Sequence, residues 1–150
     1  MQADEIKNSR EAYECIYQNV KMGADSIINL LPKVEDGHLK SDMTQQMAGY
    51  EAYASRARTE LEKLGEKAEE KGFMTRAMAR VGMEMNTMTD TTTSHIAEMM
   101  IQGSNMGVVE MQKCINACGR EEHGDTKAAT LAEEVIRFEE KNLERMKQYL

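Results

Sequence analysis

Apolar residues recur at helical spacing through the first 64 positions and divide into two segments. The first predicts a helix over about 3–31, which Pro32 ends because proline cannot continue a helix. The second predicts a helix over about 39–64, followed by Gly65. Only a short polar loop separates these segments, so we expect an antiparallel hairpin. The inward face of the first carries Ile6, Tyr13, Ile16, Tyr17, Val20, Ala24, Ile27 and Leu31, and that of the second carries Leu39, Met43, Gln46, Tyr50, Ala57 and Leu61.

The last third of the chain repeats this pattern and predicts helices over about 93–118 and 126–149. The inward face of the third helix carries Ile96, Met99, Gly103, Met106, Glu110, Cys114 and Ala117. The inward face of the fourth carries Ala128, Leu131, Ala132, Val135, Phe138, Glu139, Asn142, Leu143, Met146 and Leu150. Each face therefore contains one carboxylate, Glu110 or Glu139, within an otherwise apolar row. Because burying an unpaired charge is costly, we expect both to meet polar partners.

The segment 65–92 is interpreted as a long crossover that contains a short helix over about 73–88. Threonine, serine and aspartate fill positions 89–94, and these residues favour helix caps over helix interiors. One helix from 73 to 120 would be about 70 Å long at 1.5 Å per residue, far longer than its partners. The sequence thus predicts an all-α protein with a single domain over 1–150, a four-helix bundle of two hairpins joined by the crossover.

Composition narrows the possible fold class, partners and cellular compartment of the protein. One proline and ten glycines are few for 150 residues, in keeping with an all-α fold. The net charge of −7 argues against nucleic acid or an anionic membrane as a partner, and no segment is apolar enough to span a membrane. Three cysteines cannot all pair within one chain, and no apolar leader opens the sequence, so we expect a reducing cytoplasm. Fourteen methionines at helical spacing indicate an adaptable core rather than a copper site.

Two short spacings on the third helix need separate interpretation. Cys114 and Cys118 lie one turn apart, where they are poorly placed to form a disulfide with each other, and no second pair completes a zinc site. We interpret them as small buried hydrophobes. Gly103 and Gly107 also lie one turn apart, which indicates close helix approach or room for a bulky side chain such as Tyr50. A small cavity at that level is the alternative.

The run Glu139-Glu140-Lys141-Asn142 resembles the Glu-x-x-His segment of di-iron helical bundles, with Asn142 at the histidine position. Together with the helix lengths and the crossover, this run makes the chain similar to the ferritin-like superfamily, in particular to small bacterial members of its rubrerythrin-like branch. Di-iron members of that type use one Glu from each of two helices and a Glu-x-x-His from each of the other two. Glu110 and Glu139 match two of these carboxylate positions. The other ligand positions are occupied by Tyr13, Tyr17, Gln46 and Tyr50.

The resemblance therefore implies a degenerate site without an assembled di-iron centre. In the favoured hypothesis no cofactor is bound, and a carboxyl is protonated or hydrogen-bonded by phenols. The chain is then a non-catalytic binding or structural protein, and the resemblance implies a homo-oligomer. The buried polar candidates are Tyr13, Tyr17, Gln46, Tyr50, Glu110, Glu139 and Asn142.

Two other hypotheses remain open. In the first, Glu110 and Glu139, with Asn142 and water, hold a single divalent metal ion in a metal-binding protein or metal-dependent oxidoreductase. Oxygen ligands of this kind favour Mn, Mg or Ca over iron or zinc. In the second, Arg76 and Arg80 on the crossover helix bind a partner.

Overall fold

The computed structural model describes residues 3–66, 82–83, 88–118 and 126–150. Four long helices occupy most of these ranges: α1 (Ala3–Leu30), α2 (Gly37–Lys63), α4 (Thr93–Cys118) and α5 (Thr126–Met146). Two short 3-10 helices follow α1 and α5, η1 (Leu31–Lys33) and η2 (Lys147–Tyr149). The part of the chain described here contains no strand, which confirms the all-α prediction. The predicted crossover helix over 73–88, with Arg76 and Arg80, lies outside the described residues apart from 82–83 and 88.

Local sequence signals account for the turn between α1 and α2. Pro32 lies within η1, where it stops α1 from continuing. The side chain of Asp36 then caps α2 by accepting a hydrogen bond from the Leu39 backbone N–H at 2.8 Å. At the other end of α2, Gly65 adopts φ +78°, the left-handed conformation that commonly terminates helices. The first hairpin is thus defined by residues close together in sequence.

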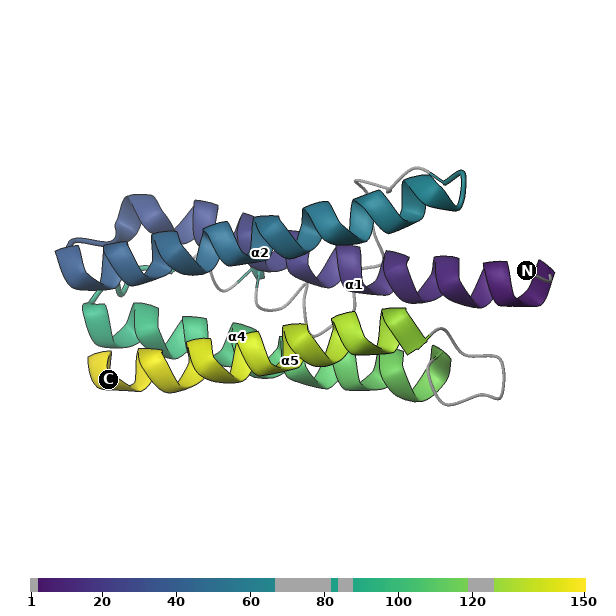
Figure 1. Ribbon diagram of the computed structural model, residues 1–150. Helices are drawn as coiled ribbons and strands as arrows, with labels where there is room; N and C mark the ends of the chain where they lie inside the picture. The colour runs from purple at the N-terminus through teal and green to yellow at the C-terminus, as the bar shows by residue number, and fades with distance from the viewer. Residues whose placement is uncertain (1–2, 67–81, 84–87, 119–125) are drawn as a thin grey trace.

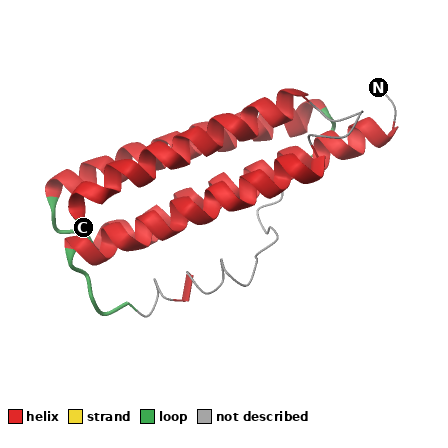
Figure 2. Cartoon of the chain, turned by 90° about the horizontal axis from the view of Figure 1, so that it is seen from below, coloured by secondary structure: helices red, strands yellow, loops and turns green. Residues whose placement is uncertain are grey.

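The helices form two antiparallel hairpins that lie along one common axis (Figure 1). Helix α1 packs against α2, α4 packs against α5, and contacts between α1 and α4 join the two hairpins. Figure 2 shows the same elongated arrangement after a quarter turn. The side chains buried most completely come from all four helices. The largest of them are Tyr17, Ile16, Ile27, Leu30, Leu39, Met43, Leu61, Ile96, Met111, Met146, Val20 and Val135.

Helices α2 and α5 are joined by polar side chains along their length. Four pairs connect them in antiparallel order: Asp42–Arg145 at 2.8 Å, Tyr50–Glu139 at 2.5 Å, Arg56–Glu134 at 2.7 Å and Glu60–Lys127 at 2.8 Å. We call this interface the α2–α5 seam. It contains the buried carboxyl groups of Asp42 and Glu139 and an open pocket.

A disulfide between Cys15 of α1 and Cys114 of α4 links the two hairpins, with the Cα atoms 6.4 Å apart. This corrects the interpretation of Cys114 as a plain buried hydrophobe, because its partner lies 99 residues away and spacing along one helix does not reveal it. The expectation of a reducing cytoplasm rested partly on the odd cysteine count. One disulfide plus Cys118 satisfies that count equally well, and a disulfide favours an oxidising compartment. Among the described residues, none of the helices combines the length and apolar character that crossing a membrane requires.

A candidate polar site inside the bundle

A buried carboxyl group lies at the middle of the α2–α5 seam. Glu139 of α5 is 3% exposed, and its Oε2 accepts a hydrogen bond from the Tyr50 hydroxyl of α2 at 2.5 Å. The hydroxyl of Ser104, from α4, faces both groups, and the side chain of Asn142 faces the Tyr50 phenol. Three helices therefore contribute to one polar cluster, which we call the Glu139 cluster: Tyr50, Ser104, Glu139 and Asn142.

Glycines on three helices make room for the Glu139 cluster and the ring beside it. A Cβ on Gly107 would lie 2.5 Å from Glu139 Oε1, and a Cβ on Gly23 would lie 2.6 Å from the Tyr50 ring. A Cβ on Gly49 would lie 2.5 Å from the Phe138 ring, which packs edge-on against Tyr50 with centroids 4.9 Å apart. Distances this short leave no space for a side chain. The cluster therefore depends on these glycines for its position.

Burial is the largest influence on the pKa values of Glu139 and Tyr50. Removal from water raises the pKa of Glu139 to about 8, although the hydrogen bonds from Tyr50 and Ser104 act in the opposite direction. Burial also raises the pKa of Tyr50 well above its ordinary value, and the neighbouring Glu139 raises it further. At neutral pH the carboxyl therefore keeps its proton, and the pair is uncharged. A neutral pair removes the cost of burying an isolated charge.

Glu110 does not belong to the Glu139 cluster. Its side chain is 17% exposed and forms an ion pair with Lys113 at 3.4 Å, at the edge of the bundle. The inward row of α4 contains Ser104, Met111 and Cys114, whereas Met106 is only partly buried. Ile96, Met99 and Cys114 of the predicted row are buried as expected. Its other members, Gly103, Met106, Glu110 and Ala117, are not buried, because the middle of α4 turns Ser104 and Met111 inward instead. Glu110 was predicted to share a buried layer with Glu139, and this position corrects that prediction.

The other predicted polar residues lie in separate surroundings. Tyr17 is fully buried, and its hydroxyl accepts a hydrogen bond from Arg58 Nη2 at 3.3 Å. Tyr13 is 2% exposed and lines a pocket toward α5. Gln46 is 3% exposed, but within the described ranges neither of its amide atoms has a hydrogen-bond partner. This differs from the expectation that each inward polar group is paired.

The donors around Glu139 do not fit a di-iron centre or another metal site rich in acidic and imidazole ligands. They are one carboxyl, one phenol, one hydroxyl and one amide. Among the described residues, no group of three or more His, Cys, Asp or Glu side chains could hold a metal ion. His38 is exposed, and Nδ1 of His95 lies 3.7 Å from Oε2 of Glu98 on the same helix. His123 is outside the described residues. The hypothesis of a single metal ion at Glu110 and Glu139 also requires Glu110 to leave Lys113.

The sequence-based prediction missed Ser104 of the Glu139 cluster, the position of Gly107 against Glu139, and Asp42 of the α2–α5 seam. Ser104 and Gly107 belong to a second helical row on α4, through Met100, Ser104, Gly107 and Met111, that has the same spacing as the predicted row. A search for polar groups on both rows would have found the serine. Asp42 is 6% exposed, forms an ion pair with Arg145 and accepts a hydrogen bond from the Tyr149 hydroxyl.

The chemistry available to the Glu139 cluster is that of a neutral acid hydrogen-bonded to a phenol. Both groups are nearly inaccessible, at 3% and 4% exposure, so they hold a proton without offering it to an external molecule. Comparison of the chain with protein-family models, curated proteins and solved structures found no match.

Proposed function

We propose that this protein is a ferritin-like bundle with a non-catalytic binding role, in which the Glu139 cluster is structural. The observation that carries the proposal is the position of the Glu139 carboxyl, which is buried against Gly107 and hydrogen-bonded by Tyr50 at 2.5 Å. A general acid or a metal ligand must reach a reacting molecule or an ion. Here the carboxyl is instead committed to protein groups from neighbouring helices.

The geometry supports this role over catalysis for a second reason. Catalytic carboxylates are used at a cleft, where a shifted pKa is combined with access for substrate. The shifted pKa of Glu139 arises from burial, and its side chain is 3% exposed. A shifted pKa without access is typical of an internal structural acid. The function is then carried by surfaces and pockets outside the Glu139 cluster.

Metal content tests this proposal against the metal-dependent alternative. Protein purified without chelator, analysed by mass spectrometry of its elements, should contain far less than one metal ion per chain. One ion per chain in the native protein, lost in both Glu110→Ala and Glu139→Gln, would overturn the proposal. Glu140→Gln, an exposed neighbour on α5, serves as the matched control. Circular dichroism of each variant separates loss of metal from loss of fold.

Self-association forms part of the proposal because the resemblance to ferritin-like bundles implies it. Light scattering coupled to gel filtration gives the molar mass directly. A mass that is a multiple of 17.0 kDa supports the homo-oligomer, and a mass of one chain excludes it.

A further inference from the structure

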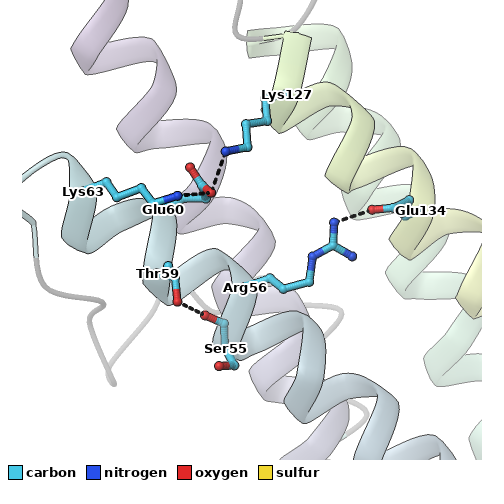
Figure 3. A network of polar contacts seen from close by, with 7 residues as sticks. All are labelled: Ser55, Arg56, Thr59, Glu60, Lys63, Lys127 and Glu134. Carbon is cyan, nitrogen blue, oxygen red and sulfur yellow. Dashed lines mark hydrogen bonds and ion pairs between the residues drawn. The ribbon is translucent and has the colours of Figure 1, made fainter.

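A pocket opens on the α2–α5 seam, near the N-terminal end of α5 and away from Glu139. Its volume is about 240 Å³, and its walls come from α1, α2 and α5. The residues that line it are Tyr13, Ser55, Arg56, Thr59, Glu60, Lys127 and Leu131. Figure 3 shows Arg56 extending from α2 toward α5, and Lys127 extending from α5 toward Glu60. The two cations therefore reach across the seam from opposite helices.

The pocket has an apolar floor and a charged rim. Tyr13 and Leu131 are 2% and 4% exposed and form the buried part of the lining. Arg56 and Lys127 have side chains that are 53% and 67% exposed, so their charged ends lie in contact with solvent. A molecule that enters the pocket would meet charge first and apolar surface below. This combination is typical of sites for small ligands with both characters.

The charges at the rim include both signs. Arg56 bonds Glu134 at 2.7 Å, and Lys127 bonds Glu60 at 2.8 Å. The hydrogen bond from Lys127 lowers the pKa of Glu60, so this carboxylate is charged at neutral pH. Lys63 also bonds Glu60, at 3.2 Å, so three cations (Arg56, Lys63 and Lys127) and two carboxylates (Glu60 and Glu134) meet at the rim. The rim therefore carries one positive charge in excess, on a chain whose net charge is −7. The pocket is thus a local site of attraction for a carboxylate.

The ion pairs at the rim leave Arg56 able to take a second acceptor. Only Nη2 of Arg56 is used in the bond to Glu134, and a guanidinium carries five N–H donors. The guanidinium also lies 5.5 Å from the centre of the Tyr53 ring, which restricts its position. Both cations are exposed, and ion pairs at a protein surface contribute little to stability, so the pairs rearrange around a ligand at small cost.

We propose that this pocket binds a small zwitterion with an apolar side chain, such as an apolar amino acid. The ligand carboxylate binds Arg56 and Lys127, and its ammonium group binds Glu60. The apolar side chain packs on Leu131 and the Tyr13 ring. This inference rests on the proposed binding role and names the class of ligand for it.

The decisive experiment is a titration with L-leucine, followed by the amide signals of residues 55–60 and 127–131 in nitrogen-edited NMR spectra. We expect saturable shifts in the native protein. Arg56→Gln should weaken binding by about 10-fold or more, since a hydrogen bond to a charged group contributes about 1.5–3 kcal/mol. Arg137→Gln, an exposed arginine on α5, should leave the affinity unchanged. Both substitutions are at exposed positions, and thermal unfolding verifies that each variant folds.

Two analogues identify which groups of the ligand are recognised. 4-Methylpentanoate lacks the ammonium group, and 3-methylbutylamine lacks the carboxylate. We expect both analogues to bind more weakly than leucine. Glu60→Gln should lower the affinity for leucine without lowering the affinity for 4-methylpentanoate. Absence of saturable shifts with leucine at millimolar concentration would overturn the inference. The inference would also be overturned if 3-methylbutylamine bound as tightly as leucine, or if Arg56→Gln bound leucine as tightly as the native protein does. Metal content tests the non-catalytic role separately, so the two failures are distinguishable.

Discussion

Among single residues, Glu139 has the property that solution measurements detect most directly. Its carboxyl has a pKa of about 8 in the folded protein, against an ordinary value of 4.5. Between these values the unfolded chain releases a proton that the folded chain keeps, so the free energy of unfolding falls as the pH rises. Glu139→Gln keeps the size of the side chain and removes this titration. We predict a flatter dependence of stability on pH for the variant, measured by urea unfolding from about pH 5 to about pH 8.

The control for this prediction is the neighbouring residue on α5. Glu140 is exposed, so Glu140→Gln should retain the native dependence on pH. If Glu139→Gln keeps the native slope between the two pKa values, then the carboxyl is not protonated in the folded protein. In that case the assignment of Glu139 and Tyr50 as an uncharged pair is wrong.

Two glycines of α4 provide a matched pair of substitutions. A Cβ at Gly107 would lie 2.5 Å from Glu139 Oε1, whereas a Cβ at Gly103 would meet nothing within 4 Å in the described structure. We predict that Gly107→Ala lowers the free energy of unfolding by about 1–3 kcal/mol, the usual cost of overpacking. Gly103→Ala should raise it by up to about 1 kcal/mol, because alanine favours helix. Urea unfolding of both variants measures the difference, and equal effects would contradict the close approach at Gly107.

Most inward residues of α5 were predictable, while those of α4 were less so. Leu150 was expected on the inward face of the last helix, but it follows η2 and is 63% exposed. Glu139 and Asn142 lie among strongly apolar neighbours, and the 3.6-residue period identifies them as buried. On α4 two rows compete, because Met106 and Glu110 follow the period as well as Ser104 and Met111 do. Tertiary contacts decide between the rows: the Ser104 hydroxyl faces Tyr50 and Glu139, and Gly107 leaves space for the carboxyl. Neither contact is visible from the sequence of α4 alone.

At the scale of elements, Asp42 fixes the C-terminal end of the chain to α2. Its carboxylate binds Arg145 Nε at 2.8 Å and accepts a hydrogen bond from the Tyr149 hydroxyl of η2 at 2.5 Å. The bond to Asp42 is the largest cause that raises the pKa of Tyr149 to about 12. We predict that Asp42→Asn lowers the free energy of unfolding by about 1–3 kcal/mol. It should also move the ionisation of Tyr149 toward its ordinary value of 10.0, as followed by ultraviolet titration.

An exposed acid provides the comparison for Asp42. Asp25 on α1 pairs with Lys21 at 3.5 Å, and its side chain is 54% exposed. Asp25→Asn should change stability by less than about 0.5 kcal/mol, since exposed pairs on one helix contribute little. Faster amide hydrogen exchange at residues 147–150 in Asp42→Asn alone would show that the effect acts through η2. Unchanged exchange there would contradict the attachment.

Helix ends were easier to predict than helix partners, for a physical reason. Pro32, Asp36 and Gly65 act on their immediate neighbours, so a local reading of the sequence finds them. The α2–α5 seam joins residues about 70 to 100 positions apart, and nothing in the sequence of one helix selects its partner. The same limit hid the pocket, whose walls come from three helices.

At the scale of the whole molecule, the disulfide controls how firmly the two hairpins are held together. Cys15 and Cys114 lie on α1 and α4, so the bond closes a loop across nearly two thirds of the chain. A crosslink over such a loop stabilises the fold mainly by restricting the unfolded chain, typically by about 2–4 kcal/mol. We predict that Cys114→Ala lowers the free energy of unfolding by this amount under oxidising conditions. Urea unfolding with and without reductant provides the measurement.

Reductant separates the effect of the bond from the effect of the lost side chain. Dithiothreitol should reduce the stability of the native protein toward that of Cys114→Ala, and it should leave Cys114→Ala itself unchanged. Cys118→Ala serves as the control, because this variant keeps the disulfide between Cys15 and Cys114. Reductant should therefore still lower its stability. If reductant does not affect the native protein, then the contacts between α1 and α4 hold the hairpins without the bond. If reductant destabilises it, then the folded state depends on an oxidised pair, and an oxidising compartment stabilises this bundle more than the cytoplasm does.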